Sequence, residues 1–412
     1  MSLLISMKSN TNRLRSFAVI LLCVTLSYKT YGVERAELIR NAVLSNGFVV
    51  SQELYDDTDS HLATVGKAFF ESEHLSLNGQ IACSTCHINH AGSSDGIPNA
   101  AGVRGIGESL ERLRSGAKIV PRNTLGLWGV GALAHKTFFW DGKLIAQDSG
   151  VLSQFGTRPP SEDPLVTAVH LPAVEIRETL EEDAFVKANK SESVDGVDLV
   201  YAAILDNLRE YEPDAVEEIA STFEIESSDL SFLHVARSVA AFIRSEFRIK
   251  TTRLEDFALG KTELTPSELL GAEIFYGKGG CAVCHRGPLF SDQKFHTVPV
   301  PPLGFGKNGF GADYGRFNTS FDPGDLYKFR TPILYNVAKT APYGHGGSMR
   351  TLREAIDSHV DPLGLVDLTS LDGFGRHEYS KVLAASDMVG SVQFISSEEI
   401  ADLIDFLNTL SF

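Results

Sequence analysis

The sequence predicts a mainly α-helical protein with two domains. Of its 412 residues, 43% are hydrophobic, which is enough to fill one or two packed cores. Segments with apolar residues three and four positions apart recur along the chain, whereas signals for β-strands are few and short. The two halves also resemble each other, because each has an aromatic-rich helical segment that runs into a C-x-x-C pair. We therefore expect one domain around each cysteine pair.

Helical spacing of apolar residues marks five segments. In chain order they are residues 54–70, 199–208, 232–247, 265–276 and 400–410. Capping clusters of serine and acidic residues, at 227–229 and 396–399, precede the third and the fifth segment. Pro266 lies just inside the start of the fourth segment, where a helix tolerates proline.

Two stretches rich in glycine, at residues 91–107 and 298–324, predict loops. The segment over 232–247 looks like the start of a second helical region. We therefore predict one domain over residues 33–230 and a second over residues 231–412.

The first 32 residues have the pattern of an export signal. Basic residues precede an apolar run over residues 17–26, and small residues come before a cleavage site that we predict after Gly32. The run is shorter than the roughly 20 residues that a membrane span needs. An uncleaved amino-terminal anchor is the alternative. We expect an exported, periplasmic protein with residues 1–32 as its signal peptide.

The charge balance argues against a nucleic-acid partner. The formal net charge is −16, and removal of residues 1–32, which carry four basic residues and no acidic one, would make it −20. Such an acidic protein repels the phosphate backbone.

The cysteines carry the clearest chemical signal. Of the five, Cys23 lies in the predicted signal peptide, and the other four form two C-x-x-C pairs, each followed directly by histidine. The motifs are Cys83-Ser84-Thr85-Cys86-His87 and Cys281-Ala282-Val283-Cys284-His285. No mature cysteine is left for an ordinary disulfide.

C-x-x-C-H is the attachment motif of covalently bound c-type haem. Two thiols at this spacing reach the two vinyl groups of one porphyrin, and the adjacent histidine lies under the iron as proximal ligand. A four-cysteine zinc site and a thioredoxin-like redox pair are the alternatives, but neither needs a histidine after each pair. We predict two haem c groups with His87 and His285 as iron ligands. What fills the sixth position of each iron then decides the function, because an open site favours peroxide chemistry.

Further motifs between and after the pairs resemble those of the bacterial di-haem cytochrome c peroxidases and their MauG-type relatives, over roughly residues 62–410. They are PRNT, FFWDG and AVEIR before the second pair, and KFRTPILYNVAKTAPYGHGG and TLREAI after it. The resemblance implies two c-type cytochrome domains, each around one covalently attached haem. It also implies an active amino-terminal haem, an electron-transfer carboxy-terminal haem and a calcium ion at the interface.

The resemblance assigns roles to five further residues. Trp140 would relay electrons between the haems, although an interdomain core position is the alternative reading. Glu175 would act as general acid and base above the active haem. Asn123, Thr340 and Pro342 match the calcium positions, where amide and carbonyl oxygens suit this ion.

Two positions depart from the family pattern. The second haem has methionine as its sixth ligand in the peroxidases and tyrosine in MauG-type proteins, and His359 occupies that place here, with Met349 as the rival ligand. A removable distal histidine of many peroxidases is replaced by Val103, and His90 is too close in sequence to His87 to serve. We expect an open iron at the first haem.

The resemblance therefore implies a peroxidase that reduces hydrogen peroxide to water, with Glu175 and Trp140 as catalytic residues. Electrons would enter at the second haem from a small donor protein, a cytochrome c or a cupredoxin. The alternatives are a MauG-type oxidase of a protein or peptide side chain, and a di-haem electron carrier with no turnover. The assembly is left open between a monomer and a homodimer.

Overall fold

The computed structural model describes residues 34–181, 194–388 and 393–412. The predicted signal peptide and its cleavage site lie outside the described residues. No helix in the described ranges is long and apolar enough to cross a membrane.

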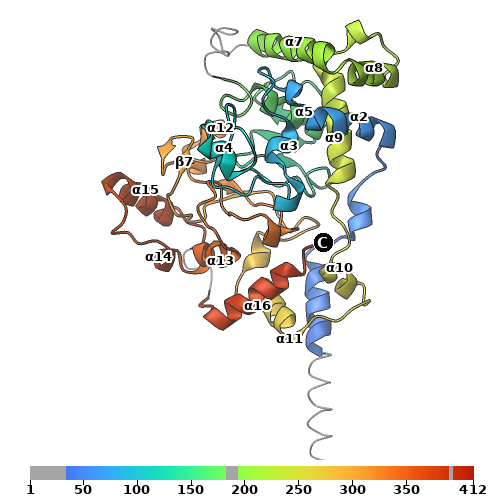
Figure 1. Cartoon of the computed structure of the whole chain (residues 1–412). Helices are drawn as coiled ribbons and strands as arrows, with labels where there is room; N and C mark the ends of the chain where they lie inside the picture. Colours follow the sequence, from blue (N-terminus) through green and yellow to red (C-terminus); the bar gives the residue numbers. More distant parts are fainter. Residues whose placement is uncertain (1–33, 182–193, 389–392) are drawn as a thin grey trace, which may run out of the picture.

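Helices dominate the structure (Figure 1). A first helix, without a label in Figure 1, spans residues 34–45. The longer helices that follow are α2 (Ser60–Glu71), α5 (Pro164–His170), α7 (Val194–Tyr211), α8 (Pro213–Thr222), α9 (Phe232–Glu246), α10 (Arg253–Ala258), α11 (Pro266–Tyr276), α13 (Leu352–Val360), α15 (Gly373–Ala384) and α16 (Ser397–Asn408). The short ones are α3 (Cys83–Cys86), α4 (Leu110–Arg114), α12 (Phe317–Ser320) and α14 (Pro362–Leu365).

The strands are short, as the sequence predicted, and they pair antiparallel. One three-stranded sheet pairs β3 (Thr137–Phe138) with β4 (Leu144–Gln147) and β4 with β5 (Gly150–Ser153). Three further sheets have two strands each. They are β1 (Ala100–Ala101) with β2 (Ile119–Val120), β6 (Phe295–His296) with β9 (Phe329–Arg330), and β7 (Phe305–Gly306) with β8 (Gly309–Phe310). The β7–β8 hairpin interrupts the stretch that the sequence predicted as loop.

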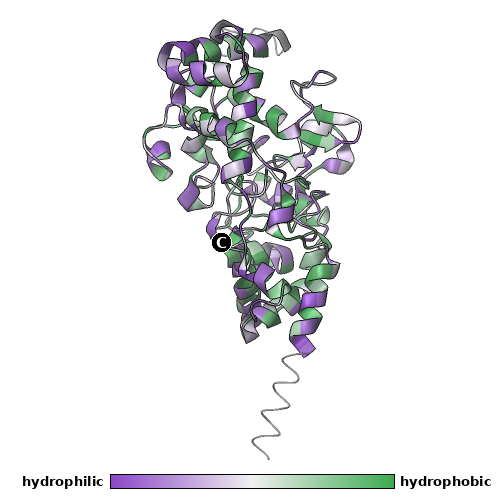
Figure 2. Cartoon of the chain, turned by 90° about the vertical axis from the view of Figure 1, so that its right-hand side faces the viewer, coloured by the Kyte–Doolittle hydropathy of each residue, from purple (hydrophilic) through white to green (hydrophobic). Residues whose placement is uncertain are grey.

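The structure has two hydrophobic cores. The first is built mainly from α2, α5, α7, α8 and α9, and the second from the helix over residues 34–45 together with α10, α11 and α16. Figure 2 shows hydrophilic and hydrophobic residues side by side on helices at both ends of the molecule, as expected of helices that cover a core with one face. Each cysteine pair follows a helix of its own core, α2 or α11.

The cores do not follow the predicted boundary between residues 230 and 231. α9 packs against α2 and is part of the first core up to Phe247, whereas residues 36–55 belong to the second core. Apolar spacing predicted α9 as a helix but could not tell which core would receive its apolar face. The chain passes from one core to the other between Phe247 and Ile249.

The predicted cap at residues 396–399 and the predicted helix start at Pro266 are confirmed. Thr265 and Glu268 form a capping box at the start of α11, and Ser396 and Glu399 form another at the start of α16. The residues at 227–229 instead form a separate 3₁₀ turn, and α9 starts from Ser231.

Glycines allow the closest helix contacts in both cores. A Cβ atom on Gly66 of α2 would lie 1.8 Å from the main-chain oxygen of Ser238 in α9. A Cβ atom on Gly271 of α11 would lie 2.0 Å from the main-chain oxygen of Asp402 in α16. Each helix pair therefore depends on a glycine that lets two backbones touch.

Gly66→Ala should lower the free energy of unfolding by about 1–3 kcal/mol, because the added methyl group forces α2 and α9 apart. The measurement is thermal unfolding of the holoprotein. Gly373→Ala is the matched control, since a Cβ atom there meets nothing within 4 Å. Equal midpoints for the two variants would contradict the close contact.

Candidate functional site

The second cysteine pair opens into a cavity of about 420 Å³. Cys281, Cys284 and His285 line it, and so does His359 from α13. The cavity also extends past the side chains of Trp128 and Trp140. The structure thus brings together the four residues that the sequence assigned to the second haem.

The three predicted iron ligands share one hydrogen-bond pattern. The Nδ1 atom of His87 lies 3.0 Å from the main-chain oxygen of Ser93, and that of His285 lies 3.0 Å from the oxygen of Phe290. In His359 the Nδ1 atom lies 2.7 Å from the oxygen of Ala355. A carbonyl acceptor places the proton on Nδ1, so that Nε2 remains free to bind a metal ion.

The protonation state of these histidines also suits ligation. Burial, together with the positive charge that His359 can carry, lowers the pKa of His285 to about 4. Burial likewise lowers the pKa of His87 and of His359. All three are therefore neutral at pH 7, the form that binds iron.

Met349, the rival ligand, lines the same cavity and is buried. Its backbone pairs with Tyr343. Cavity lining alone therefore does not separate Met349 from His359. The electrostatic influence of His359 on His285 favours His359, because it indicates that the two imidazoles lie near each other.

The first cysteine pair lies on α3, directly after the helix α2 of the first core. Burial raises the pKa of Cys83 to about 12, and the pKa of Cys86 rises for the same reason. These thiols are apolar neighbours of His87 and not reactive thiolates. This environment suits thioether attachment to a porphyrin.

Val103 and His90 are the two residues on which the expectation of an open first iron rests. Val103 is fully buried, and its main-chain N–H donates to the oxygen of Arg177 at 3.0 Å. The side chain of His90 is 72% exposed and pairs with Glu108 at 3.2 Å. His90 therefore faces the surface.

Glu175 follows the 3₁₀ turn over 172–174 and lies in a cluster of charges. Its carboxylate is 3.2 Å from the ammonium group of Lys143 and 3.7 Å from that of Lys307. Lys307 also lies 3.9 Å from Asp141. Burial alone would raise the pKa of Glu175, but the two lysines outweigh burial and lower it.

A second carboxyl group of this cluster, Glu178, was missed by the sequence analysis. Burial, reinforced by the charge of Glu175, raises the pKa of Glu178 to about 7. The charge of Glu178 also acts on Cys83 and Cys86. The cluster therefore adjoins the first cysteine pair.

Trp140 lies between the two halves. Its indole N–H donates to the main-chain oxygen of Asn123 at 2.9 Å, and its own main-chain oxygen accepts from the N–H of Arg330 at 2.8 Å. Asn123 precedes the sheet β3–β5, whereas Arg330 ends β9 of the second half. Because Trp140 also lines the cavity, both readings of this residue, relay and interdomain contact, fit its position.

Arg330 provides a test of whether the cavity suits a haem. It is buried, lines the cavity, and burial lowers its pKa to about 10. Its guanidinium donates to the main-chain oxygens of Phe139 and Thr331, and within the described residues it forms no ion pair with a carboxylate. A buried cation at the cavity wall fits the propionate groups that a porphyrin carries. The thiols, the imidazoles and this cation together fit haem c.

Two of the three predicted calcium residues, Asn123 and Pro342, are in contact. The side-chain N–H₂ of Asn123 donates to the main-chain oxygens of Pro342 at 2.7 Å and Gly344 at 3.4 Å. The side-chain oxygen of Asn123 is buried without a hydrogen-bond partner. Thr340 and Pro342 both line the cavity that Asn123 reaches. An unpartnered oxygen near two carbonyls suits a hard cation.

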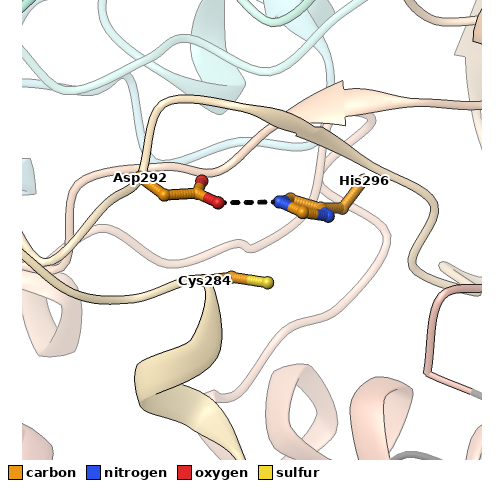
Figure 3. A group of neighbouring side chains, drawn as sticks. All are labelled: Cys284, Asp292 and His296. Carbon is orange, nitrogen blue, oxygen red and sulfur yellow. Dashed lines mark hydrogen bonds and ion pairs between the residues drawn. The ribbon is translucent and has the colours of Figure 1, made fainter.

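One further group of potential ligands lies beside the second pair. Cys284, Asp292 and His296 bring their ligand atoms within 4.8 Å of one another, and Asp292 binds His296 at 3.0 Å (Figure 3). In a chain with attached haem, the sulfur of Cys284 is a thioether and no longer a thiolate ligand. Cys284 and His296 also line the cavity, so the group belongs to the candidate haem site.

The sequence analysis missed four residues besides Glu178. They are Trp128, Lys143, Lys307 and Arg330. Trp128 packs edge to face on Phe247, and Phe247 contacts Phe70, which lies against His87. Lone charged or aromatic residues give no spacing signal, so only the folded chain reveals these positions.

Comparisons with known proteins agree with this description. Residues 60–263 match the family model described as di-haem cytochrome c peroxidase. The sequence is 25% identical over 338 residues to cytochrome-c peroxidase IdrP2 of Denitromonas iodatirespirans, which covers 74% of this chain and 78% of the relative. It is also 25% identical over 351 residues to the methylamine utilization protein MauG of Methylorubrum extorquens, covering 84% of this chain and 77% of the relative.

A solved structure supports the fold. The diheme peroxidase BthA of Burkholderia thailandensis superposes with a TM-score of 0.62 at 20% sequence identity, over 89% of each chain. The mostly helical fold is therefore that of the di-haem cytochrome c peroxidases.

His359→Met should raise the reduction potential of the second haem, because a thioether ligand favours ferrous iron more than imidazole does. We expect a rise of roughly 100 mV, a fraction of the range of about 0.8 V that axial ligands control. A spectroelectrochemical titration measures it, with the exposed His90→Met as control. An unchanged spectrum and potential would show that His359 is no ligand.

Proposed function

The chain belongs to the di-haem cytochrome c peroxidase family, and on this premise we propose that it reduces hydrogen peroxide to water with electrons from a small redox protein. The observation that carries the proposal is an asymmetry between the two halves. The second half offers two neutral histidines, His285 and His359, in one cavity. The first half offers His87 and a charged cluster around Glu175. The pair of histidines in the second half suits electron transfer, and the charged cluster in the first half suits reaction with peroxide.

A haem iron with an open position supplies the site at which peroxide is reduced by two electrons. The residues of the chain then manage the protons. Lys143 and Lys307 keep Glu175 ionised, so that its carboxylate can accept a proton from the incoming peroxide. The same carboxyl group can return that proton to the leaving oxygen, which departs as water. Two further protons and two electrons from the donor complete the formation of two water molecules.

Electrons would enter through the second half, where the His285 and His359 imidazoles line the cavity. Trp140 lies at the wall of that cavity, and its indole is hydrogen-bonded to Asn123 of the first half. An aromatic ring in this position can pass an electron between two centres. The second half would thus receive electrons, and the first half would reduce peroxide.

The donor would be a small cytochrome c or a cupredoxin. The net charge of −16 favours a donor with a basic face, because opposite charges speed encounter. The predicted signal peptide supports export to the periplasm, where such donors work.

A calcium ion is proposed at the interface of the halves. Its ligands would be the side-chain oxygen of Asn123 and the main-chain oxygens of Thr340 and Pro342. The buried, unpartnered oxygen of Asn123 supports this assignment.

A MauG-type oxidase is the second candidate function. The buried Val103 at the place of a removable distal histidine favours it, because MauG-type relatives also lack that histidine. Stopped-flow mixing of the diferric protein with peroxide separates the candidates. Fast oxidation of a reduced donor supports the peroxidase. A persistent oxidised enzyme that ignores small donors and oxidises a partner protein supports the oxidase, and no reaction would leave an electron carrier.

Glu175→Gln should lower kcat/KM for peroxide about 10²–10⁴-fold, because the amide cannot accept the proton. Glu181→Gln is the matched control: the Glu181 side chain is 23% exposed and paired with Arg104, while Glu175 is 27% exposed and paired with Lys143. Steady-state rates with a reduced donor measure both. A Glu175→Gln variant as active as Glu181→Gln would refute the role of Glu175.

Calcium added to the chelator-treated holoprotein should raise its unfolding midpoint. Binding at 100 times Kd stabilises a folded protein by about 2.7 kcal/mol. Asn123→Leu should abolish the rise, and Asn408→Leu, at an exposed position of α16, should retain it. Retention of the full rise in Asn123→Leu would place the ion elsewhere.

A further inference from the structure

A residue of the second half completes the charged cluster of the first half. Lys307 lies in the turn of the β7–β8 hairpin, between Phe305–Gly306 and Gly309–Phe310. Its ammonium group reaches Glu175 at 3.7 Å and Asp141 at 3.9 Å. Both of these carboxylates precede α9, in the part of the chain that carries the first cysteine pair. The cluster is therefore assembled from two parts of the chain that are far apart in sequence.

The hairpin is fastened to the first half by specific bonds. The side chain of Asn99 donates to the main-chain oxygen of Phe305 at 2.7 Å and accepts from its N–H at 3.0 Å. Asp313, which follows the hairpin, receives two bonds from Arg122, at 2.8 and 2.9 Å. The N–H of Lys307 itself donates to Asp313 at 3.4 Å. The backbone on which Lys307 stands is therefore fixed against the first half.

Four charged groups act on Glu175. Lys143, which directly precedes β4, and Lys307 stabilise its carboxylate, whereas Asp141 opposes it. The fourth is Glu178, whose own pKa the Glu175 charge raises. Lys143 is held by Glu175 and Asp141, which raise its pKa although burial would lower it. Glu175 therefore sits between two cations that come from different halves.

We propose that Lys307 is a positioning residue of the peroxide site, through which the second half of the chain holds the Glu175 carboxylate ionised and in place. This inference rests on the proposed function. Lys143 stabilises the same carboxylate from within the first half. Separation of the hairpin from the first half would remove one of the two cations that stabilise the base.

The sign of the effect follows from the charges. An opposite charge within about 4–6 Å lowers the pKa of a carboxyl group by roughly 1–3 units. Removal of Lys307 leaves Lys143 alone, so the pKa of Glu175 must rise. The base is then protonated at a higher pH, and activity is lost earlier as the pH falls.

Lys307→Met should therefore move the acidic limb of the kcat/KM profile for peroxide upward by about one unit. Lys307→Arg should restore the limb, because it returns the positive charge. Lys328→Met is the matched control, since its side chain is 34% exposed against 33% for Lys307 and pairs with Asp325, not with Glu175. The acidic limb of this control should stay in place. Thermal unfolding checks that all variants are folded.

An infrared titration provides a readout that does not depend on turnover. The carboxyl band that Glu175→Gln lacks reports the protonation of Glu175, and its midpoint should rise in Lys307→Met by the same amount as the limb. If Lys307→Met and Lys328→Met share both the limb and the infrared midpoint, the inference is wrong. If Glu175→Gln is fully active, the proposed function of Glu175 fails instead, whatever the lysine variants do.

Discussion

Arg122 lies between two carboxylates from opposite halves of the chain. The cavity of the second half and the charged cluster around Glu175 both depend on this contact. It donates to Asp141 at 2.6 Å and to both oxygens of Asp313, and the side chains of the two aspartates are only 1% exposed. Removal of one partner from such a buried set costs about 3–5 kcal/mol, because a charge is left unpaired. Asp141 follows Trp140, Arg122 precedes Asn123, and Asp313 follows the β7–β8 hairpin. One ion-pair group therefore holds the segments that carry Trp140, Asn123 and the β7–β8 hairpin against one another.

The two halves share one local arrangement beside their cysteine pairs. In each, a histidine next to the pair is oriented by a main-chain carbonyl near its Nδ1, which leaves Nε2 free to bind a metal ion. What differs is the opposite side. His359 of α13 lines the same cavity as His285, whereas a carboxylate between two lysines adjoins the first pair. An electron-transfer centre needs a closed coordination shell, and a peroxide site needs an open one with a proton acceptor nearby.

Sequence patterns predicted those features that depend on neighbouring residues, such as the starts of helices. The cap at Ser396 and the start of α11 at Pro266 were predicted because both signals lie within the first turn of their helices. The side of the boundary on which α9 falls could not be predicted, since its apolar face fits either core. Lys307 and Glu175 are far apart in sequence, and no spacing rule connects two single charges that meet only after folding. Motifs marked the two cysteine pairs and Glu175 as candidate site residues, whereas no motif marked Lys143 and Lys307, the charges that surround Glu175.

The most direct test of this asymmetry is low-temperature EPR of the diferric holoprotein. The account predicts two different signals of equal spin count: a low-spin signal from the centre with two histidine ligands, and a high-spin signal from the open centre. Two low-spin signals from centres that both have two protein ligands would contradict it.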